Sequence, residues 1–316
     1  MKKKKIFRLL IVLLLVITLT GCAKTLTDKD KKPVKNTVTG QNLTKNILCK
    51  PHAEKTIKLY EKNKVKIDKL PECKDLKINS GNYEGLWTTF FVKPLAFIIV
   101  LLGTKIGNYA VSLIIVSILI RLVVFPLTKK TAMQSEMMKK AQPELNRIQN
   151  KYKNKSQDKD AMMKQSQEMM AVYKKYNISP MGGCLFAFIQ LPLFIAFFEA
   201  VQRTPAIFED TFLKLQLGTT PIVGISGSNW YAYLILMLLI AASTFYSSTM
   251  TMKDTPNMDG NNSMKNMPII MSIMIIIMGL YMPSALGIYW ITTNLFTIGQ
   301  NILVKRSKEV NGKKKV

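Results

Sequence analysis

An arginine lies inside an apolar run at residues 117–128, which is SILIRLVVFPLT. The guanidinium of Arg121 stays charged, and insertion scales put the cost of such a charge at a helix centre in a bilayer at roughly 2.5–3.5 kcal/mol. Intramembrane charges commonly face a water-filled cavity and serve a function there, which makes Arg121 the first candidate site residue. The alternative is that its long side chain only extends to the inner headgroups.

Polar side chains on two further apolar stretches lie at a similar depth. With a rise of about 1.5 Å per residue, Arg121 is about 10 Å from Thr128, and Gln190 is about 15 Å from Pro180. Four residues of the last stretch recur at spacings that place them on one helix face: Trp290, Thr293, Thr297 and Gln300. We expect these side chains to line a hydrophilic groove that opens to the cytoplasm, although the threonines could instead bond to their own backbone.

Other chemistries find less support in the sequence. An intramembrane hydrolase needs a nucleophile beside a base, and the apolar stretches contain no histidine or paired aspartate. A secondary transporter would show inverted repeats, which we do not find. His52 is the only histidine and has no metal-ligand companion at a useful spacing. We therefore expect no enzymatic activity, no cofactor and no metal ion.

Composition favours a membrane protein. The 316 residues are 48% hydrophobic and still carry a formal net charge of +26. This mixture fits a chain with several membrane spans whose lysines lie in loops and tails. So basic a chain also admits ribosomal RNA as a partner, whereas we expect no DNA partner.

The amino terminus, MKKKKIFRLLIVLLLVITLTGCAK, has the form of an export signal. Its Leu19-Thr20-Gly21-Cys22 resembles a bacterial lipobox. We therefore expect residues 1–21 to be a lipoprotein signal peptide and Cys22 to carry palmitate-type acyl chains outside the membrane. An uncleaved signal anchor is the alternative.

Residues 22–85 follow this signal and should form an extracytoplasmic segment. They contain Cys49 and Cys73. Because the exterior is oxidising, we favour a disulfide between these two cysteines over two free thiols.

The rest of the chain predicts an all-α membrane protein. An outer interfacial helix is expected at 86–108, with Trp87 as its aromatic anchor; a tilted span is the alternative. Five transmembrane helices follow: 109–128, 180–202, 230–250, 267–282 and 285–304. They are joined and followed by a cytoplasmic hairpin, an outer loop, a cytoplasmic loop and a basic cytoplasmic tail: 129–179, 203–229, 251–266 and 305–316. The excess of lysine and arginine in the cytoplasmic parts agrees with this orientation.

The predicted hairpin carries two apolar stripes. The first has helical spacing and should be kinked by Pro143: Met133, Met137, Ala141, Leu145, Ile148 and Tyr152. The second marks an antiparallel partner helix: Met162, Met163, Met169, Met170 and Tyr173. These methionines could form the seam of the hairpin, could meet varied hydrophobic ligands through their adaptable side chains, or could do both.

Four motifs in this order make the chain resemble the YidC/Oxa/Alb family of membrane protein insertases from about Leu86 to Lys305. They are IRLVVFPLTKK, QPELNRIQNKYK, YNISPMGGCLFAFIQLPLFIAFFEAV and GIYWITTNLFTIGQNIL. The lipoprotein signal followed by five spans resembles the form of this family that is found in Gram-positive bacteria. Residues 22–85 fall outside the resemblance.

The resemblance implies a function in protein transport. The chain would be an insertase and chaperone in the bacterial plasma membrane, with its lipid-anchored N-terminus outside and its C-terminus in the cytoplasm. Arg121 would line a groove that receives the hydrophilic segment of a client, and Gln190, Trp290 and Asn294 match groove-facing or motif positions. The implied partners are nascent membrane proteins and membrane lipid, with the Sec translocon and the ribosome as further candidates.

Overall fold

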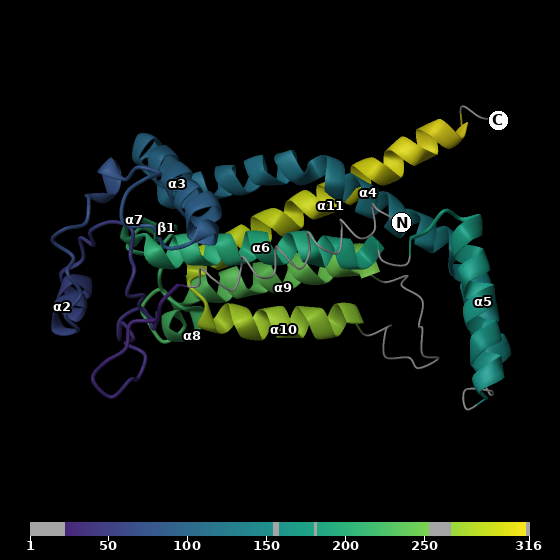
Figure 1. The fold of residues 1–316 in the computed structure, drawn as a ribbon, viewed down its shortest axis with the longest axis horizontal. Coiled ribbons are helices and arrows are strands. Elements are labelled where there is room, and N and C mark those ends of the chain that lie inside the picture. The colour runs from purple at the N-terminus through teal and green to yellow at the C-terminus, as the bar shows by residue number, and fades with distance from the viewer. Residues whose placement is uncertain (1–22, 154–157, 180–181, 253–266, 314–316) are drawn as a thin grey trace. The chain divides into compact units, whose positions relative to one another are not determined.

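The computed structural model describes residues 23–153, 158–179, 182–252 and 267–313 (Figure 1). The predicted signal peptide and Cys22 lie outside these residues, as does most of the predicted cytoplasmic loop. The chain divides into two compact units. The first comprises the described residues up to Leu119 with Phe188–Ile240 and Ile276–Thr292, and the second comprises the described residues of Ile120–Ala187, Ala241–Ile275 and Thr293 onward.

The fold is predominantly helical. Its long apolar helices are α3 (Lys93–Ile106), which follows the short π-helix η2 (Thr88–Val92), α4 (Tyr109–Tyr152), α6 (Gly182–Arg203), α9 (Trp230–Met252), α10 (Met267–Tyr281) and α11 (Ser284–Lys313). Strands are limited, in the described residues, to the two-residue pair β1 (Thr211–Phe212) and β2 (Leu215–Gln216) and to isolated bridges.

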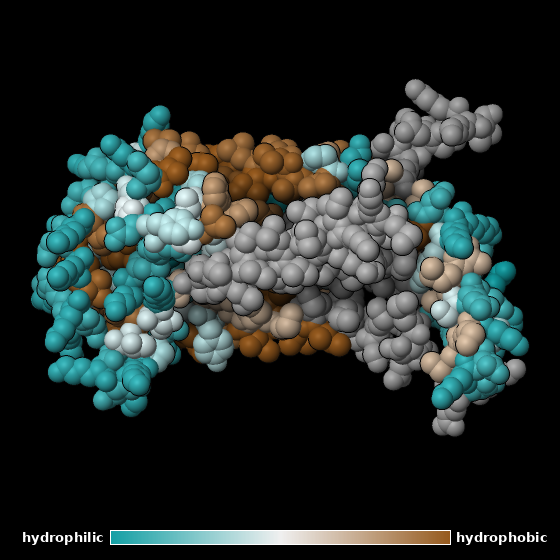
Figure 2. All heavy atoms as spheres, in the orientation of Figure 1, coloured by the Kyte–Doolittle hydropathy of each residue, from teal (hydrophilic) through white to brown (hydrophobic). Residues whose placement is uncertain are grey.

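These helices are apolar on the outside. On α4, Leu122, Val123 and Leu127 are half to three-quarters exposed, and the exposed side chains among those described on α10 are isoleucines, methionines and the terminal Tyr281. Figure 2 shows hydrophobic side chains covering the first part of α4 and α10, and hydrophilic ones around α2 and α5. Serines, threonines and Arg121 are buried instead. Because a water-soluble protein has the opposite pattern, the chain is embedded in a membrane.

Three described stretches are long and apolar enough to cross a membrane: Thr88–Ile106, Tyr109–Tyr152 and Trp230–Thr251. The first contains the helix that the sequence placed on the outer surface. Its Lys93-Pro94 pair does not interrupt it, because the π-helical turn η2 directly precedes this pair and continues into α3. A tilted span and an interfacial helix are thus both consistent with this stretch, and the topology of five spans stays a prediction.

Glycines set the turn between α3 and α4. Gly107 ends α3 in the left-handed conformation, with φ of 78°, and its N–H donates to the carbonyl of Gly103. Gly103 itself packs against the ring of Tyr109, where a Cβ would lie 2.2 Å from a ring carbon. Asn108 then caps α4 by accepting a hydrogen bond from Val111 N at 3.0 Å.

Helix α4 is longer than the span predicted within it. It runs without a break for 44 residues, through Pro126 and Pro143, so the first half of the predicted hairpin continues the membrane helix. The second half is α5 (Lys159–Lys175), which Asp158 caps by accepting from the N–H groups of Asp160 and Ala161.

The hairpin has its own small core. Its centre contains residues of both stripes and the segment after α5: Ala141, Leu145, Met169, Val172, Tyr173 and Ile178. Met137 and Ile148 pack against this core, whereas Met162, Met163 and Met170 are exposed. Only part of the methionine pattern therefore forms the seam.

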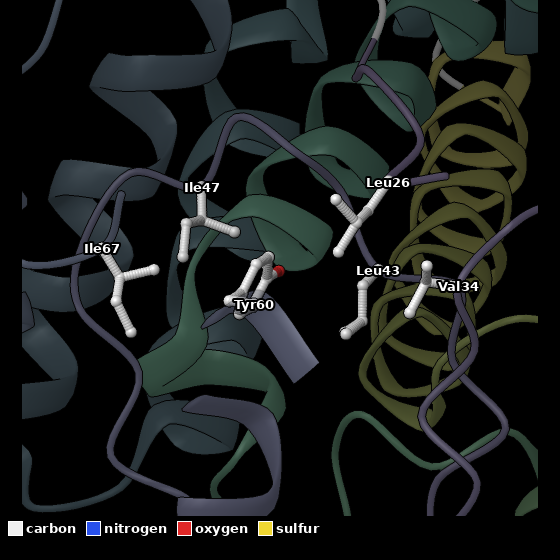
Figure 3. Packing of buried hydrophobic residues seen from close by; sticks show 6 residues of the cluster. All are labelled: Leu26, Val34, Leu43, Ile47, Tyr60 and Ile67. Carbon is white, nitrogen blue, oxygen red and sulfur yellow. The ribbon is translucent and has the colours of Figure 1, made fainter. Parts of the chain in front are cut away.

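The outer segment, residues 23–85, is a folded unit with a core of its own. Helix α2 (Glu54–Lys62) and the 3-10 turn η1 (Cys73–Asp75) are joined to bridged loops around six buried residues: Leu26, Val34, Leu43, Ile47, Tyr60 and Ile67 (Figure 3). Cys49 and Cys73 form a disulfide, the pairing that the sequence favoured. Small domains commonly need such a cross-link, because their cores bury little surface.

Candidate functional site

Arg121 lies on the inward face of α4. Its side chain is 5% exposed, and Ser117 and Thr128 on the same face are buried too, whereas Val123 on the other face is 78% exposed. The sequence dictates this division, because residues 117, 121 and 128 share one helical face.

Helix α11 presents the polar stripe that the sequence predicted. Thr293, Thr297 and Gln300 are buried, whereas Leu295 and Leu303 are about 60% exposed. Thr297 donates to the carbonyl of Thr293 at 2.8 Å, which is the local backbone bond considered as the alternative role. This bond uses the hydroxyl hydrogen and leaves the oxygen with acceptor capacity.

Side chains of the second unit join α4, α9 and α11. Thr128 on α4 donates to Gln300 Oε1 on α11 at 3.0 Å. Asn294 on α11 donates to Thr244 Oγ1 on α9 at 2.9 Å and lies 3.3 Å from Ser243 Oγ. The described side chains of this unit thus contain Arg121 together with a hydroxyl-rich set of groups.

Gln190 and Trp290 lie in the first unit. Gln190 Nε2 on α6 donates to the hydroxyl of Tyr289 at 3.2 Å. Tyr289 also packs on Phe197, with ring centroids 4.3 Å apart, and Trp290 meets Phe194 edge to ring at 5.2 Å. These two predicted residues therefore belong to an aromatic cluster between α6 and α11, and the seven predicted groove residues divide between the two units.

One polar cluster escaped the sequence analysis. Arg203, at the end of α6, is fully buried and donates to Glu84 at 2.7 Å and to the carbonyl of Asn46 at 2.8 Å. Glu199 lies one turn earlier on α6, 3.9 Å from the guanidinium. The sequence analysis did not single out Arg203, because Glu84 and Asn46 are more than 100 residues away in the sequence.

The role expected for Trp87 was wrong. An aromatic anchor in the headgroup region would be partly exposed, but Trp87 is fully buried. Its indole N–H donates to Glu199 Oε1 at 3.1 Å, and its ring stacks on Phe91 at 4.7 Å between centroids. The carboxylate of Glu199 supplies the polar partner that the headgroups would otherwise provide.

Comparison with known proteins identifies the family of this chain. The family model described as 60Kd inner membrane protein matches residues 101–313. Similar proteins include membrane protein insertase YidC 2 of Listeria innocua, 38% identical over 221 residues that cover 70% of this chain and 72% of the relative. Membrane protein insertase YidC of Oceanobacillus iheyensis is 34% identical over 71% of this chain and 86% of its own, and membrane protein insertase MisCA of Bacillus subtilis is 36% identical over 69% and 79%. The chain therefore belongs to the YidC/Oxa/Alb family.

Proposed function

We propose that this protein is a membrane insertase and chaperone and not an enzyme. It takes up the hydrophilic segment of a nascent membrane protein from the cytoplasm and releases the apolar helix of that client into lipid. The observation that carries the proposal is the inverted polarity of α4 and α11. Each of these helices turns a leucine-rich face outward and a polar face, with Arg121 or Thr297, inward.

Three contributions lower the free energy of insertion: attraction to Arg121, a shorter hydrocarbon path and transfer of the client's helix into lipid. A charge attracts an acidic or polar client segment more strongly in a medium of low dielectric constant than in water, which favours entry of that segment beside Arg121. Water held by the polar groups shortens the hydrocarbon path that the segment must cross. The transfer of the client's apolar helix of about 20 residues into the bilayer then supplies the driving free energy without nucleotide hydrolysis.

Each candidate residue has a role in this proposal. Arg121 attracts the client's acidic groups, while the hydroxyls and amides of Thr293, Asn294, Thr297 and Gln300 bind water and client backbone. Gln190 and Trp290 are the two candidate groove residues of the first unit, where they lie beside its aromatic cluster. The exposed methionines of α5, including Met163, suit apolar client segments of varied shape.

Membrane attachment and partners complete the proposal. Acyl chains on Cys22 anchor the N-terminus outside the plasma membrane, and five spans leave the C-terminus in the cytoplasm. Nascent membrane proteins and lipid are the direct partners. The Sec translocon and the ribosome, which would present such chains, are further partners.

Photocrosslinking tests the client path. A photoreactive residue at Thr297, in membranes that carry ribosome-bound nascent chains of a small single-span client, should capture the client during insertion. The matched control is Leu303, which lies on the exposed face of the same helix. Capture from Leu303 but not from Thr297 would contradict a client path along the polar face.

Removal of the charge tests Arg121 directly. We expect Arg121→Ala to slow insertion of a client with an acidic translocated tail by about tenfold, and to affect a client with an uncharged tail less. Arg306→Ala removes an exposed arginine from the same chain and should leave both rates unchanged. Equal insertion of the acidic client by a stably expressed Arg121→Ala variant would show that the charge is not required.

A further inference from the structure

The outer segment is attached to the outer end of α6 by its backbone as well as by its side chains. Leu48 N donates to the carbonyl of Arg203 at 2.7 Å, and the hydroxyl of Thr44 donates to the carbonyl of Gln202 at 3.3 Å. Carbonyl groups at a helix end lack partners within the helix. The outer segment satisfies two of them and so closes the last turn of α6.

Arg203 fixes the place of this attachment. Its guanidinium reaches Glu84 and the Asn46 carbonyl of the outer segment, and Thr88 Oγ1 at 3.4 Å. A buried arginine is tolerated only where its donors meet acceptors in the correct geometry. A shift of the outer segment along α6 would leave the charge buried without these acceptors, so the cluster permits one docked position.

A second attachment joins the outer segment to the loop after α6. Thr220 N donates to the carbonyl of Thr39 at 2.8 Å, and His52 N donates to Glu209 Oε2 at 2.8 Å. Glu209 thereby provides an acceptor just before α2. Burial raises the pKa of this carboxyl group, and hydrogen bonds from the His52 and Ala53 backbone oppose that rise.

The same loop continues the network to α11. Ser284 N donates to the carbonyl of Thr219 at 3.0 Å, and Ala285 N donates to the carbonyl of Leu217 at 2.9 Å. Gly224, in the short helix α8 (Pro221–Gly224), lies against the ring of Tyr233 on α9, where a Cβ would come within 2.4 Å. The outer segment, the loop and the outer ends of three helices therefore form one continuous assembly.

Beneath this assembly the first unit is densely packed with apolar side chains. Phe197 and Tyr289 are at most 1% exposed, and Val201 is fully buried. Among its described residues the buried charged groups are those of Arg203, Glu199 and Lys93, and the Lys93 ammonium donates to the carbonyl of Asn82 at 3.0 Å. Tightly packed interiors of this kind exclude water and ions.

We propose that the outer segment is a docked seal, which keeps the outer half of the helix assembly closed to protons and small ions, and that Arg203 is its positioning residue. A docked segment that joins α6, α9 and α11 through the loop prevents these helix ends from separating. The proposal goes beyond insertion, because a seal can be measured with no client present.

Proton permeability of the full chain in liposomes tests the seal. The readouts are the decay of an imposed pH step, followed with an enclosed pH dye, and hydrogen exchange of residues 23–85. Arg203→Met should increase both the proton leak and the exchange at Leu48 by more than about tenfold. Lys214→Met is the matched control, because it removes an exposed cation of the same loop that lies over the Tyr231 ring.

A cross-link separates loss of docking from general misfolding. Thr39→Cys with Thr220→Cys places a disulfide across the hydrogen-bonded pair, and in the Arg203→Met background it should restore the low proton leak. Faster exchange without a leak would show that the outer segment is not a seal. Unchanged exchange, or a leak that persists in the cross-linked variant, would equally overturn the proposal.

Discussion

The outer segment and the hairpin of α4 and α5 are both hydrophilic appendages of apolar helices, but they are stabilised in different ways. The outer segment has a disulfide, a core around Tyr60 and the buried Arg203 contacts. The hairpin relies on a small core and on ion pairs at its surface, with several methionines exposed. The difference is that one appendage is held in place by buried cross-chain contacts, whereas the other leaves apolar side chains at its surface.

The surface contacts of the hairpin follow one repeated pattern. Glu168 on α5 accepts from Lys151 and Tyr152, and Glu144 on α4 accepts from Lys175 and Tyr176. Each carboxylate thus joins the two antiparallel helices through a neighbouring lysine and tyrosine. Such exposed pairs contribute little stability, but they fix the register of the two helices.

Matched tyrosine truncations would give the largest difference between the two appendages. Tyr60→Ala should destabilise the outer segment by about 3–5 kcal/mol, because the cross-linked core cannot collapse around the cavity. Tyr173→Ala in the hairpin should cost less, about 2–3 kcal/mol, since two helices can move together. Hydrogen exchange of each region measures both values. A larger loss in the hairpin would reverse the comparison.

Removal of the disulfide should have the next largest effect. Cys49→Ser with Cys73→Ser opens a loop with a sequence separation of 24 and should destabilise the outer segment by about 2–4 kcal/mol. Added reductant should act in the same way on the unaltered chain and leave exchange in α5 unchanged. If protease sensitivity of residues 23–85 did not rise, the Arg203 contacts alone would hold this segment.

Acid should have the smallest effect, and it should act on the hairpin. Hydrogen bonds from Lys175 and Tyr176 lower the pKa of Glu144, and those from Lys151 and Tyr152 lower the pKa of Glu168. A carboxylate with a lowered pKa stabilises the folded state above its ordinary pKa of about 4.3, and this contribution is lost as the pH falls through the lowered value.

The measurement for this prediction is hydrogen exchange of α5 between neutral and acidic pH. Exchange corrected for its intrinsic pH dependence should rise slightly below about pH 4.3 in the unaltered chain. The double variant Glu144→Gln with Glu168→Gln should show this faster exchange already at neutral pH and no further acid step. An equal acid step in the double variant would assign the effect to other groups.

Local patterns predicted the helices and the inward polar faces well. The spacing of Thr293, Thr297 and Gln300 is a property of one helix, and so is the burial of Arg121 opposite exposed leucines. The favoured disulfide was inferred from two facts alone: the exterior is oxidising, and residues 22–85 contain two cysteines. These inferences need no knowledge of which segments meet in space.

Features that depend on distant partners could not be predicted. Trp87 is buried because Glu199 accepts its N–H from 112 residues away, and Arg203 because Glu84 lies beside it. Helix α4 also continues past Thr128, where the first span was predicted to end, because a helix can leave a membrane without a break in its backbone. Lysines after Thr128 mark a change of solvent and not a helix end.

Because α4 is one continuous helix, it acts as a lever between its two ends. Arg121 and Tyr152 lie on one helix within the second unit, about 46 Å apart by helix rise, so a tilt of about 5° at one end displaces the other by about 4 Å. Pro126 and Pro143 each lack a backbone N–H, yet α4 continues through both. A force applied to the hairpin end of α4 is therefore transmitted as torque to the segment that carries Arg121.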